Sequence, residues 1–102
     1  SASFDQDLID AFREDLTNLE SELAALMNQP MDVKAHDDLI RIAHTLRGNA
    51  NVVKLNDVVQ LATALENNIR NSNAYEPEKI ELYHKAFVSI FEQFKAFLEK
   101  FN

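Results

Sequence analysis

The sequence predicts an all-α fold, an antiparallel up-down four-helix bundle, and two observations support this prediction. The first is a shortage of helix-breaking residues, because the 102 residues contain one glycine and two prolines. A sheet protein of this size needs many turns, and turns use these residues, so we expect few, long elements. The second is a set of four segments whose apolar residues lie three or four positions apart, as on one helix face. Short connections between long helices favour antiparallel neighbours.

The first predicted helix runs from about Phe4 to Asn28. It ends before Pro30, because proline disfavours helix at the residue that precedes it. The second begins after Asp32, a residue type that often caps helix N-termini. The apolar stripe of the first helix consists of Phe4, Leu8, Phe12, Leu16, Leu19, Leu23 and Leu26, and that of the second of Leu39, Ile42, Ala43, Leu46, Ala50 and Val53.

The third predicted helix begins after Asn56, another capping residue type, and Asp57 lies favourably near its positive end. Its exit is Asn71-Ser72-Asn73. The fourth starts near Glu76-Pro77, because proline is tolerated in the first turn of a helix. The third stripe consists of Val58, Leu61, Ala62, Leu65 and Ile69, and the fourth of Ile80, Tyr83, Phe87, Ile90, Phe91, Phe94, Leu98 and Phe101.

Length and composition limit the function classes. The length fits one domain, residues 1–102, which we expect to be excised from a longer multidomain protein. The absence of cysteine excludes disulfide scaffolds, thiolate zinc sites and cysteine nucleophiles. The net charge of -7 argues against binding to nucleic acids or anionic membranes. No apolar run approaches the ~20 residues that span a bilayer, so we expect no membrane insertion. The absence of cysteine favours a cytoplasmic location, either of the whole protein or of the cytoplasmic portion of a membrane protein.

The one glycine, Gly48, lies inside the second predicted helix, where glycine costs about 1 kcal/mol relative to alanine. At about 100° per residue, His44 lies roughly 150° from the centre of the apolar stripe, nearly opposite the core. Arg47, Gly48 and Asn51 share the face of His44, three or four residues apart. This face offers an exposed imidazole, a cation and a gap where another molecule can approach the backbone.

The same region is locally basic although the protein is acidic. The stretch from Leu39 to Asn56 contains no acidic residue. It contains three basic residues, which are Arg41, Arg47 and Lys54. Such a patch attracts an acidic or phosphorylated partner. An exposed imidazole is a nucleophile through its unprotonated nitrogen, and a nearby cation stabilises a phosphoryl group attached to it. These residues suit a covalent phosphoryl carrier. They do not suit a complete enzyme, since no phosphate-binding loop is present.

The segment His44-Thr45-Leu46-Arg47-Gly48-Asn49-Ala50 resembles the H-x-L-[KR]-G-x-A signature of histidine phosphotransfer (HPt) domains. The likeness continues to Glu66. The resemblance implies that His44 is phosphorylated on Nε2, that Arg47 replaces the usual lysine, and that Gly48 lets a receiver domain dock. It also implies that Glu66 accepts a hydrogen bond from Nδ1 of His44, as in chemotaxis-type histidine kinases. Such a bond would fix the tautomer that leaves Nε2 free.

One position departs from the family pattern, because Lys54 stands where glycine is usual. Its side chain either extends the basic patch or interacts with the negative end of the second helix. Together with Arg41 and Asn51 it is a candidate for docking the partner. The departure puts the geometry of this helix exit in doubt.

Other side chains carry weaker alternatives. Glu81-x-x-His84 is a motif that binds iron in four-helix carboxylate proteins, but those sites need two such motifs, so we expect no metal. His36 is interpreted as a solvated surface residue, and Tyr75 and Tyr83 as packing residues.

The function predicted from the sequence is phosphoryl transfer from His44 to an aspartate of a response-regulator receiver domain. Phosphate comes from a histidine kinase ATP-binding domain in the same or another chain, or from a receiver. The domain itself is expected to be a monomer, to bind no cofactor and to have no autonomous active site, with Mg²⁺ on the receiver. The alternative is a helical interaction module without covalent chemistry. The intact His44, Arg47 and Gly48 favour the active form.

Overall fold

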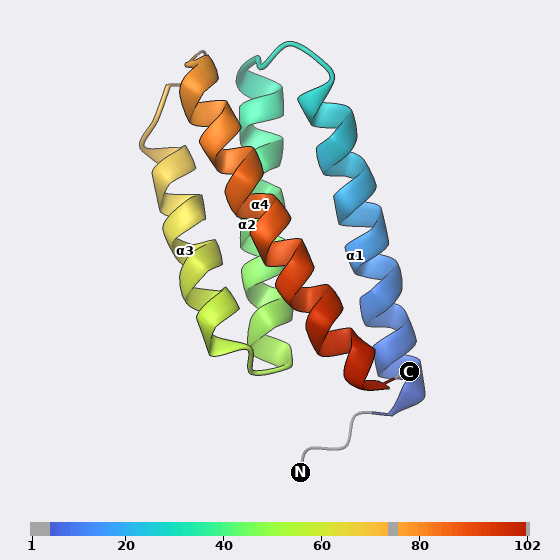
Figure 1. The fold of residues 1–102 in the computed structure, drawn as a ribbon. Coiled ribbons are helices and arrows are strands. Elements are labelled where there is room, and N and C mark those ends of the chain that lie inside the picture. Colours follow the sequence, from blue (N-terminus) through green and yellow to red (C-terminus); the bar gives the residue numbers. More distant parts are fainter. Residues whose placement is uncertain (1–4, 74–75, 102) are drawn as a thin grey trace.

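The computed structural model describes residues 5–73 and 76–101, which form four helices and a short 3₁₀ turn. The helices are α1 (Gln6–Met27), α2 (Val33–Val52), α3 (Asn56–Arg70) and α4 (Pro77–Leu98), followed by η1 (Glu99–Phe101). They run up, down, up and down, so that α1 begins and α4 ends at the same end of the bundle (Figure 1). The predicted all-α antiparallel bundle is confirmed.

The starts of α2 and α4 follow the sequence prediction, and α1 begins at Gln6, two residues after the predicted start near Phe4. Asp32 caps α2 by accepting a hydrogen bond from the Ala35 backbone N–H at 2.8 Å, and Pro77 opens α4. The prediction that Asn56 caps α3 is wrong, because Asn56 is the first residue of the helix. Leu55 occupies the cap position, and its side chain makes no capping hydrogen bond. Leu55 is held there by its own backbone N–H, which donates to the Ala50 carbonyl at 2.9 Å. The helix therefore starts one residue earlier than a polar cap suggests.

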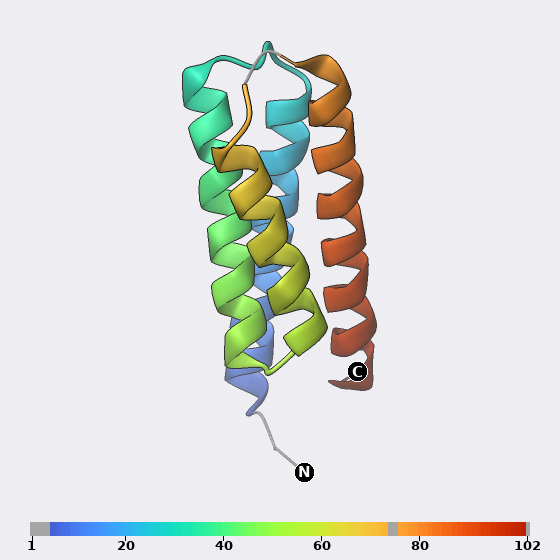
Figure 2. The same cartoon turned by 90° about the vertical axis from the view of Figure 1, so that its left-hand side faces the viewer.

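The buried residues of the four stripes form one core. Figure 2 shows the four helices that pack around it, turned by 90° from the view of Figure 1. The stripe of α2 is fully confirmed, and Leu61, Ile80 and Phe101 at stripe edges are only partly buried. The prediction that Leu8 belongs to the buried stripe of α1 is wrong, because Leu8 is 38% exposed. Ile9, which is 1% exposed, lies in the core instead. Ile9 continues the alternating steps of three and four that carry the α1 stripe to Leu26, whereas Leu8 adds a second step of four and leaves the face. Phe4 and Tyr75 lie outside the described residues.

Long side chains fasten α4 to its neighbours. The rings of Phe12 and Phe94 meet edge to face with centroids 5.4 Å apart. The Tyr83 hydroxyl donates to the Asn68 carbonyl at 3.3 Å, which supports its interpretation as a packing residue. No helix among the described residues is both long and apolar enough to cross a bilayer.

The exit of α2 is a tight left-handed turn at Lys54, whose φ is 60°. The Leu55 N–H bonds to the Ala50 carbonyl at 2.9 Å, and the Lys54 N–H to the Asn51 carbonyl at 3.2 Å. This pair of bonds defines a Schellman motif, in which glycine is the preferred residue at the left-handed position. The turn that glycine usually forms in the resembled family is therefore kept by a lysine, at a steric cost of about 1 kcal/mol.

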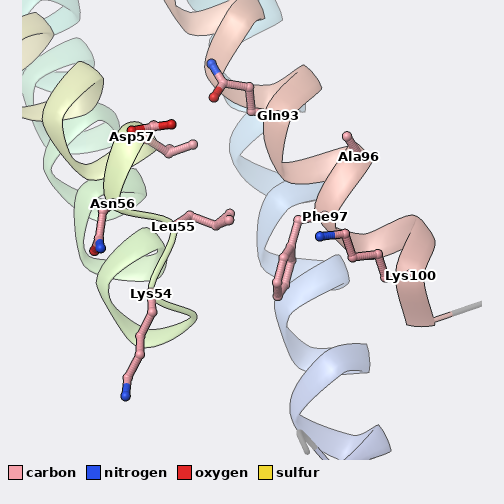
Figure 3. A pocket seen from close by; sticks show the side chains of 9 residues that line it. Lys54, Leu55, Asn56, Asp57, Gln93, Ala96, Phe97 and Lys100 are labelled. Carbon is pink, nitrogen blue, oxygen red and sulfur yellow. The ribbon is translucent and has the colours of Figure 1, made fainter. Parts of the chain in front are cut away.

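This turn aims the two neighbouring side chains in opposite directions. Leu55 points toward α4, where a shallow hollow is lined by the start of α3 and the end of α4, including Phe97 and Lys100 (Figure 3). Lys54 points away from α4 into solvent (Figure 3).

We expect Lys54→Gly to raise the free energy of unfolding by about 0.5–1 kcal/mol, because glycine adopts φ 60° without a Cβ clash. Urea denaturation of the two proteins measures the difference. Lys85→Gly is the matched control, since Lys85 is an exposed lysine inside α4, where glycine should destabilise by about 1 kcal/mol. Equal losses of stability at both positions would contradict the strain at Lys54.

Candidate functional site

His44 lies within α2 on the face turned away from the core. Its side chain is 59% exposed, whereas the apolar residues next to it on the helix, Ala43 and Leu46, are completely buried. The helical wheel predicts this placement, and the imidazole is open to an approaching molecule.

Gly48 lies one turn after His44 and borders open space. Apart from its sequence neighbours and the backbone of its own helix turn, a Cβ atom at this position would meet no atom within 4 Å. The glycine therefore does not serve close packing of helices within this bundle, nor does it serve a left-handed turn, because it lies inside regular α-helix. What the missing side chain provides is clearance above the helix surface beside His44.

Glu66 approaches His44 from α3. Its side chain is only 9% exposed, and it is the one charged residue that is buried in the described part of the chain. Both carboxylate oxygens lie 3.3 Å from Nδ1 of His44. The structure thus brings together two residues that are 22 positions apart in the sequence, as the resemblance implies.

Two arginines contact the same carboxylate. Arg70 donates from Nε and Nη2 to Oε2 of Glu66, at 3.0 Å and 2.9 Å. Arg47 places Nε 3.5 Å from Oε1, and its Nη2 lies 2.8 Å from Nδ1 of His44. Arg70 is absent from the sequence prediction. Its position four residues after Glu66 on one helix face is the pattern that could have identified it.

These contacts keep the Glu66 carboxyl ionised. Burial alone raises its pKa, but hydrogen bonds from Arg70 and His44, with the positive charges of His44 and Arg47, outweigh burial. The pKa therefore lies below its ordinary value of 4.5. At neutral pH Glu66 is a carboxylate that accepts hydrogen bonds and donates none.

The three predicted docking residues have different surroundings. Arg41 forms ion pairs with Glu22 of α1 and with Asp38, and these raise its pKa. Asn51 is exposed one turn beyond Arg47 and Gly48. Lys54 is exposed but lies in the left-handed turn beyond the end of α2, ten residues after His44 in the sequence. Acidic side chains from outside the basic stretch thus neutralise part of its charge, which the sequence pattern alone did not indicate.

The remaining histidines lie in other surroundings. His84 is exposed on α4. His36 is partly buried with its Nε2 shielded from solvent, so its interpretation as a solvated residue is wrong for that atom. Within residues 5–73 and 76–101, no three His, Asp or Glu side chains gather closely enough to hold a metal ion.

The comparison with protein families bears directly on this arrangement. The family model described as Hpt domain matches residues 4–100, nearly the whole chain. The chain belongs to the Hpt domain family. Hpt domains act in phosphorelays as carriers of a phosphoryl group on histidine, have no catalytic site of their own, and generally interact with receiver domains and kinases. No curated protein and no solved structure matches the chain.

The lowered pKa of Glu66 makes the stability of this Hpt domain depend on pH. Because the folded-state pKa is below the unfolded value of 4.5, the stabilisation is complete above pH 4.5 and is lost as pH falls through the folded pKa. We therefore expect wild type to lose stability relative to Glu66→Gln as the pH falls below 4.5. Denaturation at a series of pH values measures this difference.

Glu81→Gln is the matched control, because it removes one negative charge from an exposed position on α4. A stability difference between wild type and Glu66→Gln that stays constant from pH 7 down to pH 3 would contradict the lowered pKa.

Proposed function

We propose that His44 is the phosphorylated residue of this Hpt domain and that it passes the phosphoryl group to an aspartate of a response-regulator receiver domain. The observation that supports this choice is the contact between His44 Nδ1 and Glu66. Among the described residues, His44 is the histidine with a ring nitrogen within 4 Å of a carboxylate. It also combines exposure with the clearance above Gly48.

The transfer itself requires a lone pair on Nε2. With hydrogen on Nδ1 and Glu66 accepting it, Nε2 attacks phosphorus, and the bond from phosphorus to the donor oxygen breaks. The donor oxygen leaves with the electron pair, and the phosphoryl group remains on Nε2. The reverse sequence delivers it to a receiver aspartate, whose site we expect to hold Mg²⁺. Arg47, next to the ring, supplies positive charge to the phosphoryl oxygens.

The receiver docks over the face that carries Gly48, with Asn51 and the cations Arg41 and Lys54 around it. The ion pairs of Arg41 reduce its share in attracting an acidic receiver, so Lys54 supplies the cation that is freer to do so. Glu66 favours the chemotaxis-kinase type of Hpt domain, in which a kinase ATP-binding domain in the same or another chain supplies phosphate. We propose a cytoplasmic monomer for this domain.

We expect His44→Gln to abolish labelling by phosphoramidate or by a phosphorylated receiver, because no other histidine has this environment. The label on wild type should be labile to acid and stable to base, as a phosphorus–nitrogen bond is. His36→Gln and His84→Gln are the matched controls and should label like wild type. Undiminished labelling of His44→Gln would overturn the assignment.

Substitutions of Gly48 distinguish an effect on receiver docking from an effect on the phosphorylation of His44. We expect Gly48→Ala to raise the free energy of unfolding by up to about 1 kcal/mol, since the added Cβ meets nothing and alanine favours helix. Gly48→Gln should slow transfer to a receiver at least tenfold, while labelling by the small donor phosphoramidate changes little. Stopped-flow or quench-flow transfer assays measure the rates. Transfer from Gly48→Gln at the wild-type rate would show that the receiver does not approach over this face.

A further inference from the structure

Nδ1 of His44 has two neighbours that require opposite protonation states of this nitrogen: one can bond to it only when it is bare, the other only when it carries hydrogen. Nη2 of Arg47 lies 2.8 Å away, and the two oxygens of Glu66 lie 3.3 Å away. A guanidinium only donates hydrogen bonds and stays protonated, so it bonds to Nδ1 only when that nitrogen is bare. The Glu66 carboxylate only accepts, so it bonds to Nδ1 only when that nitrogen carries hydrogen.

A neutral imidazole carries one hydrogen, so the state of Nδ1 decides the state of Nε2. When Nδ1 donates to Glu66, Nε2 has a free lone pair and can attack phosphorus. When Nδ1 accepts from Arg47, the hydrogen is on Nε2, and that nitrogen cannot attack. Arg47 and Glu66 therefore compete over the reactivity of the nitrogen on the opposite side of the ring.

The two competitors differ in how firmly they are held. Arg70 donates two hydrogen bonds to Oε2 of Glu66, and the carboxylate is buried between the helices. Arg47 is held less firmly, because its Nε makes no hydrogen bond and lies 3.5 Å from Oε1. Its side chain is 34% exposed, so the guanidinium has room to turn outward. The arginine is the partner that can leave.

We propose that Arg47 is a positioning residue that sets the tautomer of His44, holding the ring with hydrogen on Nε2 until a phosphoryl group arrives. This inference rests on the proposed role of His44. The phosphoryl oxygens attract the guanidinium, since bidentate bonds between arginine and phosphate are stronger than a bond to a neutral ring nitrogen. As Arg47 turns toward them, Nδ1 takes a proton from water and donates to Glu66, while Nε2 releases its proton to water. Nε2 then attacks phosphorus, and the bond to the leaving donor oxygen breaks.

The shorter distance at rest favours the state in which Arg47 donates, 2.8 Å against 3.3 Å. His44 thus stays poorly nucleophilic in the absence of a phosphoryl group. The arrangement makes the reactive tautomer a response to the donor.

Long-range ¹H–¹⁵N NMR spectra test this inference, because the shifts of Nδ1 and Nε2 report the tautomer directly. Spectra are recorded at increasing pH until the ring shifts no longer change, and the exposed His84 in the same spectra is the internal reference. In wild type we expect mainly the tautomer with hydrogen on Nε2. In Arg47→Met, the ratio of this tautomer to the other should fall about tenfold, equivalent to losing about 1.4 kcal/mol of preference.

Glu66→Ala removes the other competitor and should shift the ratio in the opposite direction. Arg13→Met is the matched control for removing an arginine, because Arg13 lies on α1 and donates to the Leu98 carbonyl, and His44 should keep hydrogen mainly on Nε2. An unchanged ratio in Arg47→Met, or a wild-type ring that already carries hydrogen on Nδ1, would overturn the inference. Neither reading depends on phosphorylation, whereas labelling of His44→Gln tests the proposed function alone.

Discussion

A carboxylate enclosed between two helices is the constraint around which the surface of this domain is organised. Taking a charge out of water costs several kcal/mol unless it is paired and hydrogen-bonded. Glu66 meets this requirement with Arg70 on its own helix and with Arg47 on α2, and His44 of α2 lies against the same carboxylate. The pairing of α2 with α3 therefore fixes the imidazole and the carboxylate together. A shift of one helix along the other by a turn would separate them and leave the charge without its partners across the interface.

The same requirement explains why the site is asymmetric. Arg70, which donates two hydrogen bonds to Glu66, lies four residues away on the same helix. The helix backbone holds these two side chains close together at little entropic cost. The contacts across the helix pair are longer and shared among several groups. The firmest contacts of the carboxylate thus lie within α3, and its longer contacts lie on the side of the ring that we propose to react. A phosphoryl carrier needs this division, because its histidine must change partners in every cycle.

The fold and part of the site could be predicted from the sequence because they depend on short-range periodicity. The stripe of α2, opposite His44 and Gly48, follows directly from spacing. The sequence predictions were wrong where the packing of the helices overrides a local sequence preference. Leu8 fits a step of four as well as Ile9 fits a step of three, and only the packed register selects between them.

The helix start at Leu55 likewise depends on a bond back to the preceding helix, which no capping preference contains. The contact of Arg47 with Nδ1 depends on one choice of side-chain rotamer and lies beyond any sequence pattern. Neutralisation of Arg41 by Glu22 also requires knowing that α1 lies beside α2.

The opposite placement of core and site on α2 has an evolutionary consequence. Ala43, Leu46 and Ala50 are fully buried, whereas His44, Gly48 and Asn51 alternate with them on the outside. Substitutions on the outer face touch few core contacts, and distant effects on folding tend to add independently. A paralogue could therefore exchange one signalling partner for another through single surface steps, each nearly neutral for folding. The helix that carries the proposed reactive group can thus diversify in specificity while its inner half continues to hold the bundle together.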